Sequence, residues 1–323
     1  MANLYIITNE WNEQQWFNTG GTRAKKYFQS PDGKFYYFKR SQLKPGKDYT
    51  FEFWNEIIAY ELGTMLGFNM LQYDIAIEGD VMGCICESMI DSEQEELIEG
   101  VKYLQAYSPD YDPAKKEHQK WYTFNLIERA LQSAKIGHFI DDVIKIIIFD
   151  SLIGNRDRHQ ENWAAISRQE LITDIVDELE KSKKIILSKT DKSLFSWAKK
   201  HINLKKEKGE KIPGILYKTI TKFSPIYDSG SSLGRELLEE RVNLYLNNPA
   251  EVNRYIEKGS SEIHWDGKKC NHFELIGNLL QTKHATVVNG IIISVLDKYN
   301  NKEISRMIHE IDKDVPMGLG KYK

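Results

Sequence analysis

The hydrophobic pattern of this chain changes near residue 90, and that change restricts its fold more than any other feature of the sequence. Before it, short runs of aromatic and β-branched residues predict strands. A turn at Ser30–Gly33 separates two of these runs, because proline presets φ and glycine permits a positive φ. Apolar residues at helical spacing from Phe51 to Leu66 predict one helix, ending at Gly67. The predicted strands span residues 4–8, 25–29, 34–40, 72–77 and 81–86.

Beyond residue 90 the apolar residues recur mainly at helical spacing. The range 138–153 is apolar on almost every side, which is typical of a helix buried in a core. We predict an α+β fold with a small β-rich N-lobe containing one helix (residues 1–88) and a larger, mainly helical C-lobe (residues 89–323). Valine and isoleucine in the last predicted helix also suit a strand. The predicted helices span residues 121–133, 138–153, 233–245, 273–280 and 286–296.

Composition excludes several classes of protein. The chain has 323 residues, of which 41% are apolar, so it can bury a large core and is not a disordered tail. Its 44 basic and 47 acidic residues give a net charge of −3, so we expect no direct nucleic-acid binding. The three cysteines fit a reducing compartment, and Cys84 and Cys86 are expected to be neighbours on a strand rather than a disulfide.

The sequence shows no targeting or membrane-spanning segment. Residues 1–9 lack the pattern of a secretory signal. The longest apolar run, Val143–Phe149, is far shorter than the roughly 20 residues that span a bilayer. We expect a soluble, cytoplasmic protein with no integral membrane association.

One segment, residues 168–213, differs in composition from the rest of the chain. It holds 12 lysine and arginine residues against 8 acidic residues. A solvated insertion or a surface helical hairpin explains such a segment, and Leu171–Leu179 gives it an apolar face. Because it lies between the two motifs described next, we expect it beside the active site, where it could influence the choice of substrate.

The polar string from Gly154 to Trp163 follows the predicted buried helix and contains the residues most suited to chemistry. Asp157 and Asn162 are five residues apart, which is the spacing of the catalytic loop of protein kinases. In that loop the aspartate accepts or orients the hydroxyl proton, and the asparagine binds a divalent metal ion. Helix caps also use Asp and Asn, but so dense a cluster exceeds what a cap requires.

Further residues complete a phosphoryl-transfer site in the order that kinases use. Asp228 begins an Asp-Ser-Gly turn, where kinase folds place their main Mg²⁺ ligand. Lys39 ends a predicted strand and Glu56 lies on the following helix, so the two can form the ion pair that orients a lysine towards phosphates. A loop before the hairpin could wrap phosphates through its backbone N–H groups. Its residues are Thr19, Gly20, Gly21, Thr22 and Arg23.

Two strings, Gly-Asn-Arg-Asp-Arg-His-x-x-Asn-Trp and Ser-Pro-Ile-Tyr-Asp-Ser-Gly-Ser-Ser-Leu-Gly, resemble the HipA-like serine/threonine kinase family, which includes bacterial toxin kinases. The first string is also similar to the catalytic loop of phosphoinositide 3-/4-kinases. The resemblance implies a two-lobed protein-kinase-like fold that binds ATP and Mg²⁺. It implies that Asp157 is the catalytic base, that Asn162 and Asp228 are metal ligands, and that Lys39 contacts phosphate.

The same resemblance implies a switch and an adenine-binding hinge. In this family the loop matching Thr19–Arg23 can be autophosphorylated and ejected, which makes Thr19 or Thr22 a predicted phosphosite. The segment Cys86–Met89 falls where a hinge strand binds adenine, so Glu87 and Met89 belong to the predicted nucleotide site. His159 is expected to orient the loop or to stabilise the transferring phosphate, or only to pack the loop.

The expected function is therefore an ATP- and Mg²⁺-dependent kinase that phosphorylates serine or threonine of a protein substrate, acting as a toxin or a delivered effector. Two alternatives stay open: a phosphoinositide or small-molecule kinase, and a nucleotide-binding pseudokinase that regulates by protein contact. The resemblance implies an antitoxin or regulatory protein as a partner. The chain begins close to the small lobe, so we expect it to lack the N-terminal subdomain of longer HipA proteins, which weakens that inference.

Overall fold

The computed structural model describes residues 2–15, 25–41, 43–44, 47–48, 52–91 and 93–316. The chain divides into two compact units, which are described separately. The predicted lobe boundary at residue 88 and the predicted limits of the insertion stay predictions. Unit 1 comprises Met1–Met89, Glu99–Ala164 and Ser224–Lys323, and unit 2 comprises Ile90–Ile98 and Ala165–Phe223.

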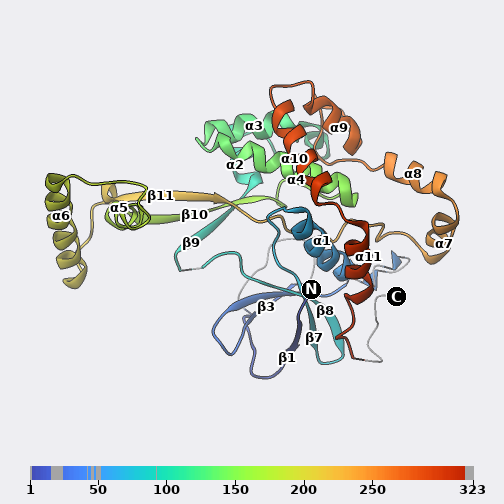
Figure 1. Ribbon diagram of the computed structural model, residues 1–323, viewed down its shortest axis with the longest axis horizontal. Helices are drawn as coiled ribbons and strands as arrows, with labels where there is room; N and C mark the ends of the chain where they lie inside the picture. Colours follow the sequence, from blue (N-terminus) through green and yellow to red (C-terminus); the bar gives the residue numbers. More distant parts are fainter. Residues whose placement is uncertain are drawn as a thin grey trace. The chain divides into compact units, whose positions relative to one another are not determined.

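A six-stranded sheet forms the N-terminal part of unit 1 (Figure 1). Its strand order is β1-β7-β8-β4-β3-β2. The first pair in this order is parallel, and the other neighbours are antiparallel. All five predicted strands are present, with small differences at their ends. The strands are β1 (Leu4–Ile7), β2 (Asn12–Glu13), β3 (Lys25–Gln29), β4 (Phe35–Lys39), β7 (Asp74–Glu78) and β8 (Val81–Glu87), and β5 (Leu43–Lys44) pairs separately with β6 (Lys47–Asp48).

The turn between β3 and β4 sets the register of this hairpin. The Ser30 N–H donates to the Lys34 carbonyl (2.8 Å), and Gly33 has the positive φ (85°) expected of a turn glycine. The resulting register places Lys25 directly opposite Lys39. Since opposed residues lie on the same face of an antiparallel pair, the two lysines lie on one face of the sheet.

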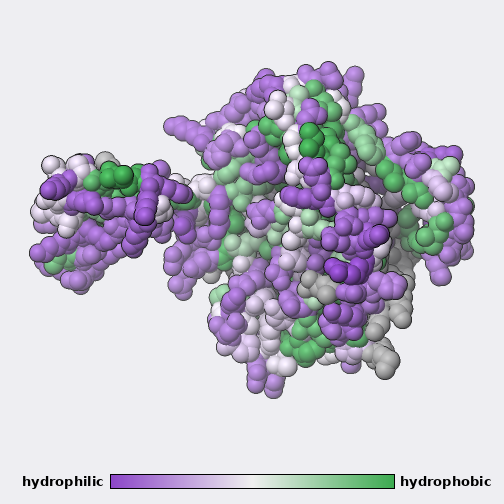
Figure 2. All heavy atoms as spheres, in the orientation of Figure 1, coloured by the Kyte–Doolittle hydropathy of each residue, from purple (hydrophilic) through white to green (hydrophobic). Residues whose placement is uncertain are grey.

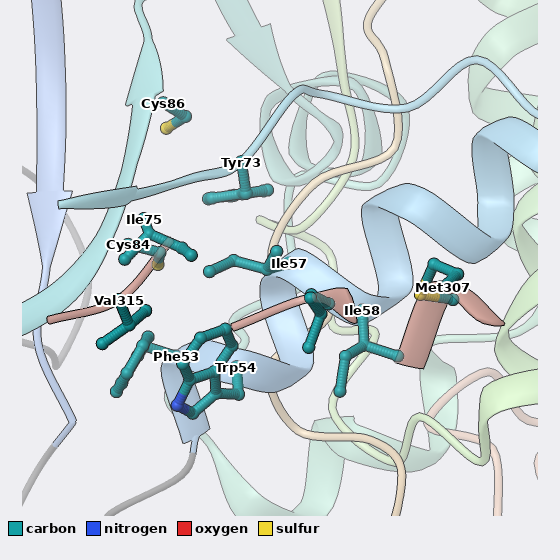
Figure 3. Packing of buried hydrophobic residues seen from close by; sticks show 11 residues of the cluster. Phe53, Trp54, Ile57, Ile58, Tyr73, Ile75, Cys84, Cys86, Met307 and Val315 are labelled. Carbon is teal, nitrogen blue, oxygen red and sulfur yellow. The ribbon is translucent and has the colours of Figure 1, made fainter. Parts of the chain in front are cut away.

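Helix α1 (Glu52–Leu66) packs against the sheet and against the C-terminal helix α11 (Asn301–Glu310). Trp54 and Ile57 of α1 have no exposed surface. Figure 3 shows α1 residues, strand residues and Met307 of α11 in one packed cluster, so the end of the chain contributes to the core beside the sheet. The buried members are Phe53, Trp54, Ile57, Ile58, Tyr73, Ile75, Cys84, Cys86, Met307, Ile311 and Val315.

Cys84 and Cys86 of this cluster are buried free thiols on β8. The prediction that they are strand neighbours rather than a disulfide is confirmed.

Helices make up most of the rest of unit 1. The buried helix α4 (Ile140–Ile153) ends at Gly154, whose φ of 65° lets the chain leave the helix and enter the polar string. The range 286–296, for which the sequence also allows a strand, lies in helix α10 (Ala285–Lys298). The other helices are α2 (Gly100–Tyr107), η1 (Lys116–Trp121), α3 (Phe124–Ser133), η2 (Gly137–Phe139), α7 (Glu239–Asn247), α8 (Pro249–Glu257) and α9 (His272–Leu279).

The helix predicted over 233–245 is wrong at its start, because α7 begins only at Glu239. Leu233 and Gly234 have φ values of 53° and 72°. A right-handed helix does not contain residues with positive φ, so these two residues form a turn before α7.

Unit 2 contains a three-stranded sheet with the order β11-β10-β9. Two helices connect its central strand to an edge strand, and they form a helical hairpin, which is one of the two alternatives that the sequence allows within residues 168–213. Two ion pairs, Lys192 with Glu180 and Lys199 with Asp177, join the helices. The elements are β9 (Glu95–Glu99), β10 (Ala164–Leu171), α5 (Ile172–Lys181), α6 (Lys189–Glu207), η3 (Gly214–Leu216) and β11 (Tyr217–Phe223).

Hydrophilic residues cover most of the visible face of α5 and α6, with a smaller apolar area among them (Figure 2). Exposed apolar residues of α6 include Leu194 and Trp197. The expected position of this unit beside the active site stays a prediction. None of the described helices combines the length and the apolar composition that crossing a membrane requires.

Candidate active site

Lys39, Glu56 and Asp228 meet at one buried point although they lie far apart in the sequence. The Lys39 Nζ at the end of β4 is 3.0 Å from Glu56 Oε1 on α1 and 3.1 Å from Asp228 Oδ1. It also donates to the Tyr73 hydroxyl (3.3 Å). Lys39 and Glu56 are 8% and 2% exposed. The structure therefore brings together three of the residues that the sequence predicts for phosphate and metal binding.

The charges at this point keep Lys39 cationic. Burial by itself lowers the Lys39 pKa, but the Asp228 and Glu56 carboxylates outweigh burial and raise the pKa well above its usual value. Lys25 responds in the opposite direction, since burial first and then the charge of Lys39 lower its pKa. Burial raises the pKa of the Cys86 thiol to about 12, so this neighbour stays neutral.

The Asp228 turn is held tightly against α1. Asp228 has a φ of 55°, a left-handed backbone that is uncommon for a residue with a side chain. The Ser229 N–H donates to Glu56 Oε2 (2.7 Å). A Cβ on Gly230 would lie only 3.2 Å from Glu56 Oε1 and 3.3 Å from the Glu52 carbonyl oxygen. Glycine at this position therefore permits the close approach that places Asp228 beside Lys39.

The Asp157 loop has its own hydrogen bonds. Asp157 Oδ2 accepts from Ser231 Oγ (2.9 Å), and the Asp157 N–H donates to Asn155 Oδ1 (3.2 Å). Asn162 is buried, and its Nδ2 donates to the Asp157 carbonyl (2.6 Å). This hydrogen bond orients the Asn162 side chain, whose amide oxygen is the atom that could bind a cation.

Arg158 connects the Asp157 loop to the Asp228 turn. It is 1% exposed and pairs with Asp150 on α4 (Nη2 to Oδ1, 2.9 Å). Its Nη1 donates to the carbonyl of Asn162 (2.9 Å) and also to that of Tyr227. One guanidinium group therefore bonds the backbone of Asn162, a predicted metal ligand, and that of Tyr227, the residue before the other predicted ligand, Asp228.

The other predicted site residues are His159, Glu87, Met89 and the loop from Thr19 to Arg23. His159 Nδ1 accepts the Glu161 N–H (3.2 Å), which places the proton of the neutral ring on Nε2. Glu87 pairs with Lys34 (2.9 Å). Within the described ranges, neither Glu87 nor Met89 has a hydrogen bond or ion pair to Lys39, Asp157 or Asp228. Thr19, Gly20, Gly21, Thr22 and Arg23 lie outside the described residues.

Sequence reasoning missed several residues of this centre: Lys25, Tyr73, Asp150, Arg158 and Ser231. Several of them act through contacts between distant parts of the chain, for which a single sequence holds no signal. There are two exceptions. The register of the predicted hairpin would have placed Lys25 opposite Lys39. Asp150 and Arg158 are only eight residues apart.

The fold resembles that of a solved bacterial kinase. The Helicobacter pylori proinflammatory kinase CtkA matches with a TM-score of 0.66 at 16% identity, over 98% of this chain and 88% of that chain. The chain has a protein-kinase-like fold. The kinase-like fold implied by the motif resemblance, with an N-terminal sheet lobe and a helical C-terminal region, is thereby confirmed.

The remaining comparisons give no further support for the kinase-like fold. Shewanella oneidensis MR-1 HipA, solved with HipB and operator DNA, matches with a TM-score of 0.33 at 14% identity, over 88% of this chain and 61% of that chain. At this TM-score the match supports no structural argument. No protein-family model and no curated protein sequence matches the chain.

Proposed function

We propose that the chain is an ATP- and Mg²⁺-dependent protein kinase that phosphorylates serine or threonine. The observation that carries this proposal is the contact of Lys39 with both Glu56 (3.0 Å) and Asp228 (3.1 Å). Kinases need a lysine oriented by a glutamate and an aspartate that binds metal, and both requirements meet here at one atom. The fold of a solved kinase over 98% of the chain supports the proposal.

The residues present suit Mg²⁺ bound together with ATP. No three His, Cys, Asp or Glu side chains converge on a metal site within the described parts of the chain. Mg²⁺ in kinases is held by one or two protein side chains, phosphate oxygens and water, so a three-residue cluster is not required. Asp228 and Asn162 would supply the protein ligands, since Arg158 holds both loops. The bound ion neutralises phosphate charge and orients the phosphates.

Asp157 would act on the acceptor. In this role it takes the proton of the acceptor hydroxyl while that oxygen attacks the γ-phosphorus and the bond to the β-phosphate oxygen breaks. Ser231 orients the carboxylate through its 2.9 Å hydrogen bond. Lys39 would bind the α- and β-phosphates, and His159, Glu87, Met89 and the loop from Thr19 to Arg23 stay predicted parts of the site.

The experiment is transfer of labelled γ-phosphate from ATP to the protein itself, to a cell lysate and, in parallel, to phosphoinositide vesicles. We expect labelling of serine or threonine in protein, loss of labelling in Asp157→Ala and loss without Mg²⁺. Asp141→Ala, an exposed acid on α4, is the matched control and should label as the parent does. Equal labelling by Asp157→Ala would contradict the assignment, and labelling of vesicles alone would favour the lipid-kinase alternative.

Regulation and location are further parts of the proposal. A phosphopeptide containing Thr19 or Thr22 after incubation with ATP would support autophosphorylation of that loop. An antitoxin or regulatory protein as partner, the absence of direct nucleic-acid binding and a cytoplasmic location stay proposals. Co-purification of the tagged chain from its native cells would identify the partner.

A further inference from the structure

A basic hollow lies beside the Asp157 loop, and the proposed chemistry does not use it. It has a volume of about 410 Å³ and lies within unit 1. Arg156, Arg241, Arg254 and Lys258 line it, against a single acidic lining residue, Glu251. These cations come from three segments: the loop that carries Asp157, helix α7 and the end of helix α8. Their convergence differs from the composition of the whole chain, which has a net charge of −3.

The position of Arg156 is fixed by its neighbours. Its guanidinium lies over the ring of Tyr255 (5.1 Å from the ring centre) and 3.5 Å from Glu236. Tyr255 in turn donates its hydroxyl to Glu236 (2.9 Å). The backbone N–H of Arg156 also donates to the backbone carbonyl of Ser231 (3.5 Å). The side chain of the same serine bonds to Asp157. Because Arg156 lines the hollow, an anion bound there would lie near the proposed acceptor position.

Two of the four cations that line the hollow have no acidic partner among the described residues. Arg254 pairs with Glu251 (2.6 Å), but Arg241 and Lys258 have no ion-pair partner within the described residues. Arginine presents a planar fork of donors that suits carboxylate and phosphate groups. A hollow in which Arg241 and Lys258 both lack an ion-pair partner among the described residues therefore favours an anionic ligand.

We propose that this hollow binds anionic side chains of the acceptor protein, glutamate, aspartate or phosphoserine, within a few residues of the phosphorylated position. The proposal rests on the proposed kinase function and adds the class of substrate. Arg156 lines the hollow and directly precedes Asp157 in the same loop, so an acid bound in the hollow lies within a few residues of a hydroxyl at Asp157.

The aromatic residues of the hollow argue against single-stranded nucleic acid as its ligand. Such ligands bind by stacking bases on free aromatic faces. Here the Tyr255 ring packs against Tyr245 (5.4 Å between ring centres) and against Arg156. The hollow therefore offers charge but little stacking surface.

The test uses the full chain and serine peptides that differ only in having glutamate, phosphoserine or lysine at the three positions on each side of the acceptor. We expect the glutamate or phosphoserine peptide to have at least a tenfold higher kcat/KM than the lysine peptide. The double variant Arg241→Glu/Lys258→Glu should lose or reverse this preference and keep the parent's KM for ATP. The matched control is Lys302→Glu/Arg306→Glu, which reverses one exposed lysine and one exposed arginine on α11 and should keep the preference.

A direct binding measurement separates failure of this proposal from failure of the kinase assignment. Fluorescein-labelled versions of the same peptides, and a labelled single-stranded RNA of equal net charge, are titrated by anisotropy. If no peptide is phosphorylated, the kinase proposal fails, whereas acidic-peptide binding that is lost only in Arg241→Glu/Lys258→Glu still supports the hollow. Equal use of acidic and basic peptides, a preference unchanged in that variant, or tighter binding of RNA that the variant abolishes would overturn the proposal.

Discussion

The Asp157 carboxylate accepts a hydrogen bond from Ser231 Oγ (2.9 Å), and this contact joins the Asp157 loop to the residues after the Asp228 turn. A hydrogen bond to a charged group contributes roughly 1.5–3 kcal/mol. Loss of this orienting bond in Ser231→Ala should therefore lower kcat about tenfold to a hundredfold. The KM for ATP should change less than about twofold, because Ser231 bonds to Asp157, the proposed base, and not to Lys39, the proposed phosphate-binding residue.

Steady-state phosphorylation kinetics on one peptide acceptor provide the measurement. Ser231→Thr keeps the hydroxyl and should recover most of the parent's kcat. A rise in the KM for ATP with unchanged kcat would show that Ser231 acts on nucleotide binding instead.

Several site residues could be predicted because they occur in short motifs with a characteristic spacing. Asp157 and Asn162 share one short loop, and Asp228 shares a tripeptide with a glycine. Ser231 reaches Asp157 across 74 residues, and Tyr73 reaches Lys39 across 34. Such contacts depend on the packing of the folded chain, so local spacing does not predict them.

One buried ion pair joins helix α4 to the Asp157 loop, and its arginine also bonds the backbone before the Asp228 turn. Asp150 on α4 is 3% exposed and accepts Arg158 Nη2 at 2.9 Å. Removing one partner of a buried pair typically costs about 3–5 kcal/mol, because the other charge stays buried. Asp150→Asn should lower the free energy of unfolding by about that amount, as measured by chemical denaturation. Kinase activity should fall with it, since Arg158 holds the backbone of Asn162 and Tyr227.

The matched control lies on the same helix. Asp142 forms an ion pair with Lys145 (2.8 Å) in which the two side chains are 31% and 46% exposed. Solvent-exposed pairs contribute little, so Asp142→Asn should change stability by less than about 1 kcal/mol. Equal effects of the two substitutions would show that the Asp150 pair does not anchor these loops.

Elements with a strong hydrophobic pattern are the ones that the sequence predicts well. The predicted strands and the buried helix α4 are present, because aromatic, β-branched and apolar residues define them. The β10–β11 ribbon was missed because polar residues such as Arg168, Gln169 and Glu170 break its apolar pattern. The sequence predicts the start of helix α7 too early, because a single sequence does not reveal the positive φ of Leu233.

The last helix connects the C-terminal end of the chain to the N-terminal sheet. Met307 of α11 is 6% exposed and packs in the cluster that contains Ile57 and Ile58 of α1 (Figure 3). Because α1 also carries Glu56, we expect the C-terminal segment to stabilise the helix that orients Lys39. The sequence divides the chain near residue 88, but this core draws on both sides of that boundary.

Truncation of Met307 tests whether these distant segments unfold together. A buried methionine replaced by alanine costs about 2–5 kcal/mol, so Met307→Ala should lower the free energy of unfolding by that amount. Ile308→Ala is the control, since Ile308 is the next residue of α11 and is 40% exposed, and its effect should be below about 1 kcal/mol. Hydrogen exchange should show the amides of α1 and α11 losing protection together in Met307→Ala. If α11 exchanges rapidly while α1 stays as protected as in the parent, the C-terminal helix does not support the residue that orients Lys39.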